Sequence, residues 1–403
     1  MNSDAPKVLH PVCGKPMIEY VVDIARKLRS LKIYVVLGFK SEVVREVLPP
    51  DLRVVIQKKF LGTADAIRSA APFFRTHRGD VLILSADTPL LTKETVESVV
   101  QKHRSSAAAC TFLTAIVPHA HGYGRIIRDE CAKVVAIREE KDASLREKEI
   151  HEINVGVYCF DSKELFELIK VIKLNPNKKE FYLTDVIDLL VRKKAVVETV
   201  KTPDFQEGLG INTREDLSFA ESVIRKKILR NFMLQGVTIV DPQTTYIDAD
   251  VKIGRDTVIR PLTVIEKDIQ IGSRCLIGPF CRLRSGTQIA DGVEIGNFTE
   301  VSRTQIKESS LMKHFGFLGD ARVGSKVNIG AGTVTANYDG KNKNITTIAD
   351  EAFIGSDSIL VAPVKIGKKA ATGAGAVITS GHNVPDGKVA AGIPARIISR
   401  RKF

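Results

Sequence analysis

Two polar residues occupy positions at which their side chains could do chemistry. Asp87 follows an apolar run, and a carboxylate at the end of a buried strand is a natural Mg²⁺ ligand beside phosphates. His314 stands just ahead of Asn328, Asn337 and Tyr338. An imidazole beside such a polar patch can take a proton from an amine before acyl transfer. A turn aspartate and an ordinary surface histidine are the simpler alternatives.

A period of six residues organises the second half of the chain. An α-helix cannot keep such a period on one face, whereas a short strand and a turn repeated around a coil can. We therefore predict a parallel β-helix of stacked hexapeptide repeats. The first aliphatic positions of the period are Ile247, Ile253, Ile259, Ile265, Ile271, Ile277, Leu283, Ile289, Ile295 and Val301.

The period then fails over a short region. It slips at Ile306, is broken by the polar segment 336–345 and resumes at Ile348. A loop that leaves a regular coil is where we expect a binding site. The coil holds two histidines, His314 and His382, which are too few for a three-histidine zinc site in one chain. A purely structural coil is the alternative.

The first half alternates β-branched runs with amphipathic stretches. This pattern predicts a doubly wound, mostly parallel α/β sheet, in which ligands bind beyond the carboxyl ends of the strands. Gly62 lies in such a loop, where it permits close backbone approach. The predicted strands are 32–37, 53–57, 81–85, 108–115, 133–137, 153–160 and 196–201, and the predicted helices are 17–28, 64–71, 93–103, 164–172 and 184–192.

A helix is predicted to connect the two halves. Thr213 and Asp216 resemble a capping box at its start, and Gly236 ends it. The predicted domains are therefore an α/β domain at 1–212, a linker helix at 213–236 and the β-helix at 237–403.

Composition restricts the partners. The net charge of +13 suits phosphate-bearing substrates, and no RNP, KH or zinc-finger pattern accompanies it, so we expect no nucleic acid. No apolar run approaches the roughly 18 residues of a spanning helix, and we recognise no signal peptide. We expect a cytoplasmic protein without membrane contact. The cysteines are predicted to be structural thiols, with Cys275 and Cys281 on one face of the coil.

Ordered motifs along the whole chain resemble sugar-phosphate nucleotidyltransferases, and more narrowly the bifunctional N-acetylglucosamine-1-phosphate uridyltransferase/glucosamine-1-phosphate acetyltransferase family. In the first half they are Pro6-Lys7-Val8-Leu9-His10-Pro11, Gly14-Lys15-Pro16-Met17, Leu61-Gly62-Thr63, Asp87-Thr88-Pro89-Leu90, Gly122-Tyr123-Gly124-Arg125-Ile126, Ile153-Asn154-Val155-Gly156 and Leu183-Thr184-Asp185. In the coil they are Gly296-Asn297-Phe298, Leu318-Gly319-Asp320-Ala321, Asn328-Ile329-Gly330-Ala331-Gly332-Thr333, Asn337-Tyr338-Asp339-Gly340 and Gly355-Ser356.

The resemblance implies uridyl transfer in the first domain. An oxygen of N-acetylglucosamine-1-phosphate would attack the α-phosphorus of UTP and release pyrophosphate. By carry-over, Lys7 neutralises phosphate charge, and Mg²⁺ is held by Asp87 and Asn212. The uridine is assigned to Gln57, Gly62 and Thr63, and the sugar to Gly124, Glu139 and Asn154.

For the coil, the resemblance implies acetyl transfer from acetyl-CoA to glucosamine-1-phosphate. It also supplies the left hand of the coil and a homotrimer with sites between subunits. By carry-over, His314 is the base and Arg284 binds the sugar phosphate. The sugar site is assigned to Asn328, Asn337 and Tyr338, and the acetyl-CoA site to Ala331, Ser356 and Ala374.

Two positions in the coil depart from the family. Ser302 replaces a lysine and Phe317 replaces a tyrosine, and both usual residues hold the sugar phosphate. Charge-assisted hydrogen bonds contribute about 1.5–3 kcal/mol each, so we expect weaker acceptor binding and an impaired activity. Lys307 and Lys313 are the candidates for compensation.

The family also opens with an apolar strand and a glycine-rich phosphate loop, which are missing ahead of Met1. The absent strand is expected between 32–37 and 81–85, where its loss leaves ladder groups unpaired. We expect the start to be an internal methionine or a fragment boundary, which the upstream coding DNA tests.

Three hypotheses are open at this point. The first is the bifunctional enzyme. The second is a nucleotidyltransferase for another sugar-1-phosphate, with the β-helix only as a trimerisation scaffold. The third is a non-catalytic structural or regulatory fragment.

Overall fold

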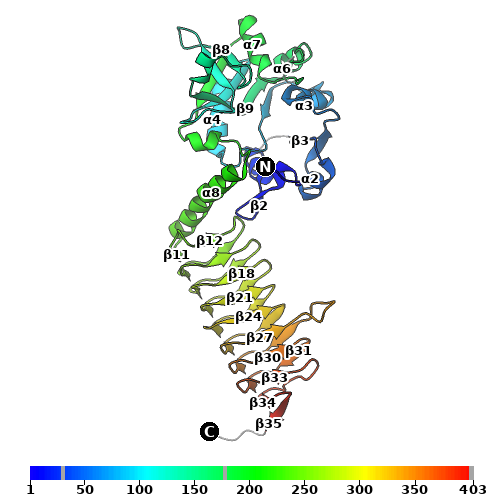
Figure 1. Cartoon of the computed structure of the whole chain (residues 1–403), viewed down its shortest axis with the longest axis vertical. Coiled ribbons are helices and arrows are strands. Elements are labelled where there is room, and N and C mark those ends of the chain that lie inside the picture. The colour runs from blue at the N-terminus through cyan, green and yellow to red at the C-terminus, as the bar shows by residue number, and fades with distance from the viewer. Residues whose placement is uncertain (29–31, 176–178, 399–403) are drawn as a thin grey trace. The chain divides into compact units, whose positions relative to one another are not determined.

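The computed structural model describes residues 1–28, 32–175 and 179–398 (Figure 1). The chain divides into two compact units. The first comprises Met1–Val12 and Pro16–Ala220, and the second comprises Cys13–Lys15 and Glu221–Phe403.

The first unit contains two separate sheets of an α/β fold. A parallel pair, β3–β4, forms the smaller sheet, and the larger has the order β10-β6-β9-β7-β8 with β5 paired to β9. The strands are β3 (Tyr34–Leu37), β4 (Arg53–Ile56), β5 (Asp80–Ile83), β6 (Cys110–Ile116), β7 (Arg125–Arg128), β8 (Val134–Arg138), β9 (Glu152–Asp161) and β10 (Val197–Lys201); β1 (Pro11–Val12) and β2 (Lys15–Pro16) pair in a hairpin. Every predicted strand of this half is present.

Strand direction in the larger sheet is mixed. The expected parallel arrangement holds for β3–β4 and for β10–β6. The long strand β9 instead runs antiparallel to β5, β6 and β7. Alternating strands and helices in the sequence do not reveal this reversal, because a reversed strand carries the same apolar pattern as a parallel one.

The helices begin and end close to their predicted limits. The linker helix α8 starts with the predicted reciprocal cap, in which Thr213 Oγ1 accepts from Asp216 N and Asp216 Oδ2 accepts from Thr213 N. The helices are α1 (Met17–Lys27), α2 (Ser41–Val47), α3 (Thr63–Ala70), α4 (Lys93–Ser105), α5 (Leu145–Lys148), α6 (Ser162–Leu168), α7 (Asp185–Arg192) and α8 (Arg214–Leu234). The sequence did not predict α2 and α5, which are short. Among the described residues, no helix is long and apolar enough to cross a bilayer.

A cavity of about 1240 Å³ separates the two sheets of this unit. Its walls include Tyr34–Val36 of β3, Val81–Ile83 of β5 and apolar residues of α1 such as Val22. In the part of the chain that the structure describes, β3 pairs only with β4, and β5 pairs only with β9. Each therefore has one edge without a strand partner.

The second unit is a left-handed parallel β-helix whose short strands stack into three sheets. Ile247 of β12 pairs with Ile265 of β15, so three six-residue steps complete one turn. Sheet I consists of β11 (Thr238–Ile239), β14 (Val258–Ile259), β17 (Leu276–Ile277), β20 (Glu294–Ile295), β23 (Leu311–Met312), β26 (Asn328–Ile329), β29 (Phe353–Ile354), β32 (Ala371–Thr372), β34 (Val389–Gly392) and β35 (Ala395–Ile398).

Sheets II and III complete the coil. Sheet II consists of β12 (Tyr246–Ile247), β15 (Val264–Ile265), β18 (Arg282–Arg284), β21 (Thr299–Ser302), β24 (Gly316–Gly319), β27 (Val334–Ala336), β30 (Ile359–Val361) and β33 (Val377–Ile378). Sheet III consists of β13 (Lys252–Ile253), β16 (Gln270–Ile271), β19 (Gln288–Ile289), β22 (Gln305–Ile306), β25 (Ala321–Val323), β28 (Thr346–Ile348) and β31 (Val364–Ile366).

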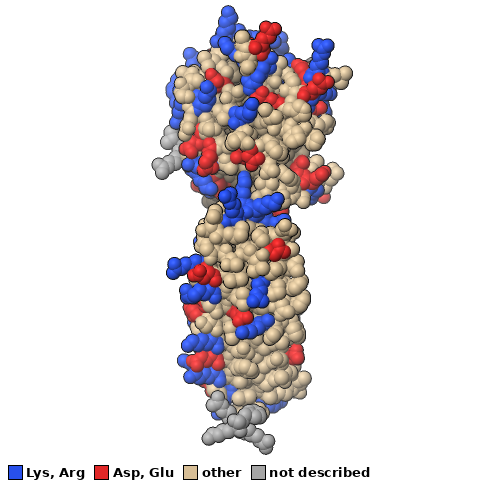
Figure 2. Space-filling view, turned by 90° about the vertical axis from the view of Figure 1, so that its left-hand side faces the viewer, with Lys and Arg blue, Asp and Glu red and all other residues tan. Residues whose placement is uncertain are grey.

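The predicted aliphatic positions form the core of the coil. All ten are buried except Ile253, which is partly buried. Figure 2 shows basic and acidic side chains together along one edge of the coil, whereas much of the visible face is uncharged. Cys275 and Cys281 are buried free thiols, as predicted. They do not share a face, because one six-residue step leads from sheet I to sheet II.

The irregular part of the coil is confined to one corner. We call the turns from sheet II to sheet III corner II–III. Two successive corners, after Val301 and after Leu318, take five residues instead of six to reach the next core position. The next corner contains the polar excursion 336–345, which includes a bridge between Tyr338 and Lys343.

Candidate active sites

Lys7, Asp87 and Asn212 meet in the first unit. The Lys7 ammonium lies 2.5 Å from Asp87 Oδ2 and 2.8 Å from Asn212 Oδ1. Asp87 follows β5, as predicted, and its carbonyl accepts from Ile211 N at 2.9 Å, which fixes the segment carrying Asn212 beside it. The two predicted magnesium ligands therefore already share one cation.

These residues suit Mg²⁺ rather than an all-protein metal cage. Within the described residues, no group of three or more His, Cys, Asp or Glu side chains could hold a metal ion. Mg²⁺ usually takes one or two protein oxygens and completes its shell with water and substrate phosphates. The oxygens of Asp87 and Asn212, converging on one ammonium, fit that requirement.

The predicted uridine residues surround the start of α3. Gln57 Nε2 donates to Gly62 O at 3.1 Å and to Asp65 Oδ2 at 2.9 Å. Gly62 has φ 96°, and an added Cβ would lie 2.6 Å from Phe181 O. Both constraints require glycine. Thr63 Oγ1 accepts from Leu183 N at 3.0 Å, so its hydroxyl has a structural contact.

The predicted sugar residues form a second group. An added Cβ at Gly124 would lie 3.6 Å from Asn154 Cβ and 3.7 Å from Glu139 Cδ. Glu139 accepts from Thr184 Oγ1 at 3.0 Å. The register of β9 against β6 shifts beside Asn154, and Gly156 takes φ 84° there. Such a bulge redirects a side chain, which is a common device at active sites.

A set of carboxylates surrounds this second group. Burial, together with the nearby carboxylates of Asp188, Glu139 and Asp142, raises the pKa of Asp185, at the start of α7, to about 6. Thr63, Glu139 and Asn154 line the cavity between the two sheets, as do Leu183 and Thr184. The motif Leu183-Thr184-Asp185 thus contacts both the predicted uridine residues and the predicted sugar residues.

In the coil, four predicted residues form a column. His314, Ala331, Ser356 and Ala374 lie in successive turns from sheet I to sheet II, which we call corner I–II. Backbone bonds link these turns, with Gly332 N donating to Phe315 O and Asp357 N donating to Ala331 O. The His314 side chain is exposed and forms no hydrogen bond within the described residues. It is therefore accessible to a substrate amine.

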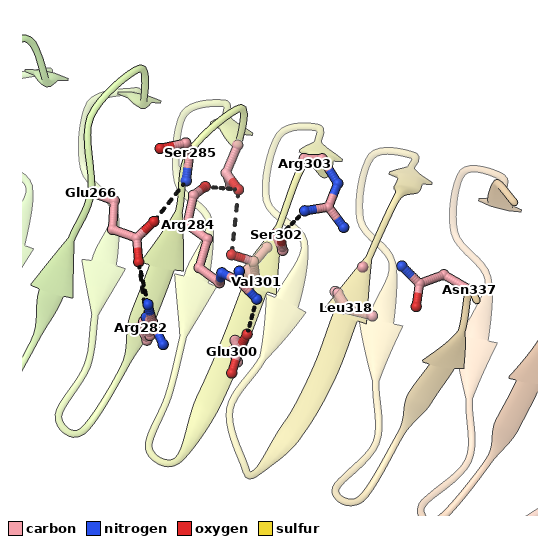
Figure 3. A network of polar contacts seen from close by, with 12 residues as sticks. Glu266, Arg282, Arg284, Ser285, Glu300, Val301, Ser302, Arg303, Leu318 and Asn337 are labelled. Atoms are coloured by element: carbon pink, nitrogen blue, oxygen red, sulfur yellow. Dashed lines mark hydrogen bonds and ion pairs between the residues drawn. The ribbon is translucent and has the colours of Figure 1, made fainter. Parts of the chain in front are cut away.

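A polar network occupies the other end of the sheet II strands (Figure 3). Arg284 Nη1 bonds Glu300 Oε1 at 2.9 Å, and Arg284 is the strand partner of Ser302. Arg303 Nε and Nη2 donate to the two oxygens of Asp320 at 2.6 and 2.8 Å. Asn337 Nδ2 donates to the same carboxylate. Arg303 and Asn337 thereby hold the pKa of Asp320 below its usual value.

Phe317 lies between the two ends. An added Cβ at Gly319 would lie 2.6 Å from Phe317 Cζ and 2.8 Å from Asn337 Nδ2. The ring carbon that would carry a tyrosine hydroxyl and the Asn337 amide therefore both lie close above Gly319. The departure at Phe317 removes a donor from the surface of sheet II beside Asn337.

The structure does not bring every predicted acetyl-transfer residue onto this surface. Asn328 belongs to β26 in sheet I, and Tyr338 lies in the excursion with its hydroxyl bonded to Gly340 O at 2.7 Å. Lys313 pairs with Glu294 at 3.0 Å, next to corner I–II, and Lys307 follows β22 in sheet III. Neither lysine lies at corner II–III.

Sequence reasoning did not single out Arg303. Its side chain reaches the site because the corner after Ser302 is one residue short. The five-residue step from Val301 to Ile306 was visible in the sequence, but it did not indicate which side chain the short corner exposes.

Comparisons with known protein families find a match in each half of the chain. A family profile described as "MobA-like NTP transferase domain" matches residues 1–151, and one described as "Bacterial transferase hexapeptide (six repeats)" matches residues 268–303. The fold and these sites therefore define a nucleotidyltransferase joined to a hexapeptide-repeat acyltransferase.

The chain is also similar to curated proteins over nearly its whole length. It is 42% identical to "Bifunctional protein GlmU" of Bacillus subtilis (strain 168), covering 100% of this chain and 95% of that protein. The proteins of the same name from Geobacillus sp. (strain WCH70) and Pseudothermotoga lettingae are 42% and 44% identical, and each alignment covers 96% of this chain and 91% of the relative.

The chain belongs to the bifunctional GlmU family. It is accordingly a bifunctional enzyme of UDP-N-acetylglucosamine synthesis, with uridyltransferase and glucosamine-1-phosphate acetyltransferase activities. This conclusion does not favour a β-helix that serves only as a scaffold.

Proposed function

We propose that glucosamine-1-phosphate binds along the outer surface of sheet II. Its amine faces His314 at corner I–II, and its phosphate faces Arg284 at the other end of the strands. The observation that carries this proposal is the placement of a free imidazole and a cation-rich network at opposite ends of the same strands. Strand β24 has four residues, so its length is roughly 13 Å, comparable to an extended sugar phosphate with its contacting side chains.

His314 is the proposed general base. It takes a proton from the amine as the nitrogen attacks the acetyl carbonyl of acetyl-CoA. The new N–C bond forms, the C–S bond breaks, and the CoA thiolate receives a proton. Ala331, Ser356 and Ala374 continue the His314 column along corner I–II, which gives the thioester an elongated binding surface of small side chains. Asn337 contacts the sugar, and Asn328 and Tyr338 lie farther from it.

In the first unit, we propose that Lys7 binds phosphate while Asp87 and Asn212 hold Mg²⁺. The metal ion would neutralise charge on the phosphates of UTP. Lys7 bonds both ligands, so it would turn toward the incoming phosphates when a metal ion takes its place. Gln57, Gly62 and Thr63 would contact the uridine, and Gly124, Glu139 and Asn154 the sugar. The domain limits at 212 and 236 and a cytoplasmic location stay predictions.

A homotrimer formed through the coil is the proposed assembly. Corner I–II carries an exposed apolar row that ends beside His314, namely Leu262, Phe280, Phe298 and Phe315. The Phe280 and Phe298 rings stack with centroids 4.9 Å apart. Contiguous exposed apolar surface of this kind is typical of an interaction site. A neighbouring copy at this row would lie beside the acetyl-CoA column.

The direct test is CoA release. The purified chain, supplied with acetyl-CoA and glucosamine-1-phosphate, is expected to release free CoA, detected by a thiol reagent. Pyrophosphate release from UTP and N-acetylglucosamine-1-phosphate, with and without Mg²⁺, tests the first unit. No CoA release above the acetyl-CoA blank would contradict the acetyl-transfer assignment.

A further inference from the structure

Arg303 is held in a fixed orientation at the first shortened corner. It has φ 48°, and its stem packs beside Gly286, where an added Cβ would lie 3.4 Å from Arg303 Cγ. Besides the two bonds to Asp320, its Nη1 donates to Ser302 Oγ at 2.8 Å. Asp320 stands at the second shortened corner with φ 50°, so the two short corners place these charges side by side.

The guanidinium keeps donors available for a ligand. An arginine side chain has five N–H donors, of which Asp320 and Ser302 take three. One N–H on each terminal nitrogen thus has no partner within the described part of the chain, and the Arg303 side chain is 37% exposed. Two N–H groups on one planar fork match two phosphate oxygens.

The surroundings favour an anion at this position. Arg284 lies on one side of Ser302 and Arg303 on the other (Figure 3). Lys343 is close enough to lower the pKa of Asp320. The carboxylates of Glu300 and Asp320 balance two of these three cations, which leaves one positive charge at the end of sheet II.

We propose that Arg303 binds the phosphate of the amino-sugar phosphate acceptor and supplies the charge that Ser302 lacks. The role rests on the acetyl transfer proposed above. Ser302 is a positioning residue: its side chain is fully buried and its hydroxyl orients the guanidinium. A long side chain at Ser302 would compete for the space that Arg303 occupies.

The test compares acceptor binding by the full chain and its variants. Calorimetric titration with glucosamine-1-phosphate is expected to show about 10- to 100-fold weaker binding for Arg303→Gln, because a charge-assisted contact is lost. The Kd for acetyl-CoA is expected to stay within twofold. Arg322→Gln, which removes an exposed arginine from sheet III, is the matched control and should bind the acceptor like the wild type.

Two further comparisons separate phosphate recognition from a structural role. With glucosamine, which lacks the phosphate, Arg303→Gln should bind like the wild type, whereas a damaged site would bind both sugars less well. The double variant Ser302→Lys/Arg303→Gln should recover at least half of the lost binding energy. Wild-type affinity of Arg303→Gln for glucosamine-1-phosphate, or an equal loss for both sugars, would overturn the role of Arg303. Absence of CoA release by the wild type would instead contradict the acetyl-transfer proposal.

Discussion

The two units of this chain obtain their cores in different ways. In the β-helix, each strand pairs with the equivalent strand of the next coil. The aliphatic side chains of successive coils therefore stack on one another, and the core is built from contacts between neighbouring repeats. In the α/β unit, strands far apart in sequence must meet, and a cavity of about 1240 Å³ separates β3–β4 from the larger sheet. The coil tolerates local irregularity, whereas the α/β unit depends on contacts between distant segments.

The same difference affects how the functional residues are held in the two units. In the coil, two corners are one residue short and a third carries a long polar loop, yet the core is preserved. The strands that follow each of these corners again pair in register with the preceding coil. Its proposed site therefore lies on an intact scaffold. In the α/β unit, the residues that line the cavity include predicted substrate contacts such as Glu139 and Asn154, so packing and binding are coupled there.

The largest expected effect is a loss of acetyl transfer, assigned to the coil, without a loss of uridyl transfer, assigned to the α/β unit. Replacing His314→Asn should lower the rate of acetyl transfer by about 10²- to 10⁴-fold, because the imidazole that takes the proton from the amine is lost. The unfolding temperature and uridyl transfer should match the wild type, since the side chain is exposed and forms no hydrogen bond within the described residues. The measurement is CoA release under saturating acetyl-CoA. A loss of less than tenfold would argue against His314 as the base.

Matched core truncations test the packing contrast. Leu283→Ala in the fully enclosed coil should lower the free energy of unfolding by about 2–5 kcal/mol. Leu82→Ala, at the cavity wall, should cost about 1 kcal/mol, because its neighbours on one side are already missing. Urea unfolding followed by circular dichroism gives both values. Equal costs would mean that the cavity does not weaken the packing around β5.

The apolar row at corner I–II is tested by assembly state. If the coil forms the proposed trimer, Phe298→Ser is expected to shift it toward monomers, with a loss of about 1–3 kcal/mol per subunit contact, as measured by sedimentation equilibrium. Phe353→Ser is the control, because Phe353 is exposed on strand β29 of sheet I and does not belong to the apolar row. An unchanged assembly for Phe298→Ser, or an equal shift for both variants, would place the interface elsewhere.

The smallest effect concerns pH and Asp185. Its pKa in the folded chain, about 6, lies above its ordinary value of 3.8. Ionisation therefore costs stability as pH rises from about 4 through 6, and the cost persists at higher pH. Asp185→Asn should raise the free energy of unfolding by about 1 kcal/mol at about pH 8 and leave it unchanged near pH 4. The same difference at both pH values would contradict this assignment.

The secondary structure and the coil core followed from the sequence to a large extent. An aliphatic residue at every sixth position is typical of a β-helix with those side chains in its core, so the buried positions from Ile247 to Val301 could be predicted directly. Strand direction could not be predicted, since β9 carries the same apolar signal in either direction. The assignment of Cys275 and Cys281 to one face was wrong, because the repeat of a face is three steps rather than one.

The candidate sites were predictable as sets of residues but not as geometry. The site formed by Lys7, Asp87 and Asn212 depends on a backbone hydrogen bond from Ile211 N to Asp87 O. No local sequence pattern predicts this contact. The importance of Arg303 depends on a corner one residue short and on the orientation of its side chain toward Asp320. The sequence pattern shows that a corner is one residue short, but it does not show in which direction the side chain at that corner points.

The central claim is that the outer surface of sheet II binds the acetyl acceptor. A crystal structure of the full chain with glucosamine-1-phosphate tests it most directly. We expect the phosphate between Arg284 and Arg303, the sugar over Gly319 beside Phe317 and Asn337, and the amine directed toward corner I–II. Ordered sugar phosphate bound on sheet I or sheet III, with these two arginines uncontacted, would contradict the account.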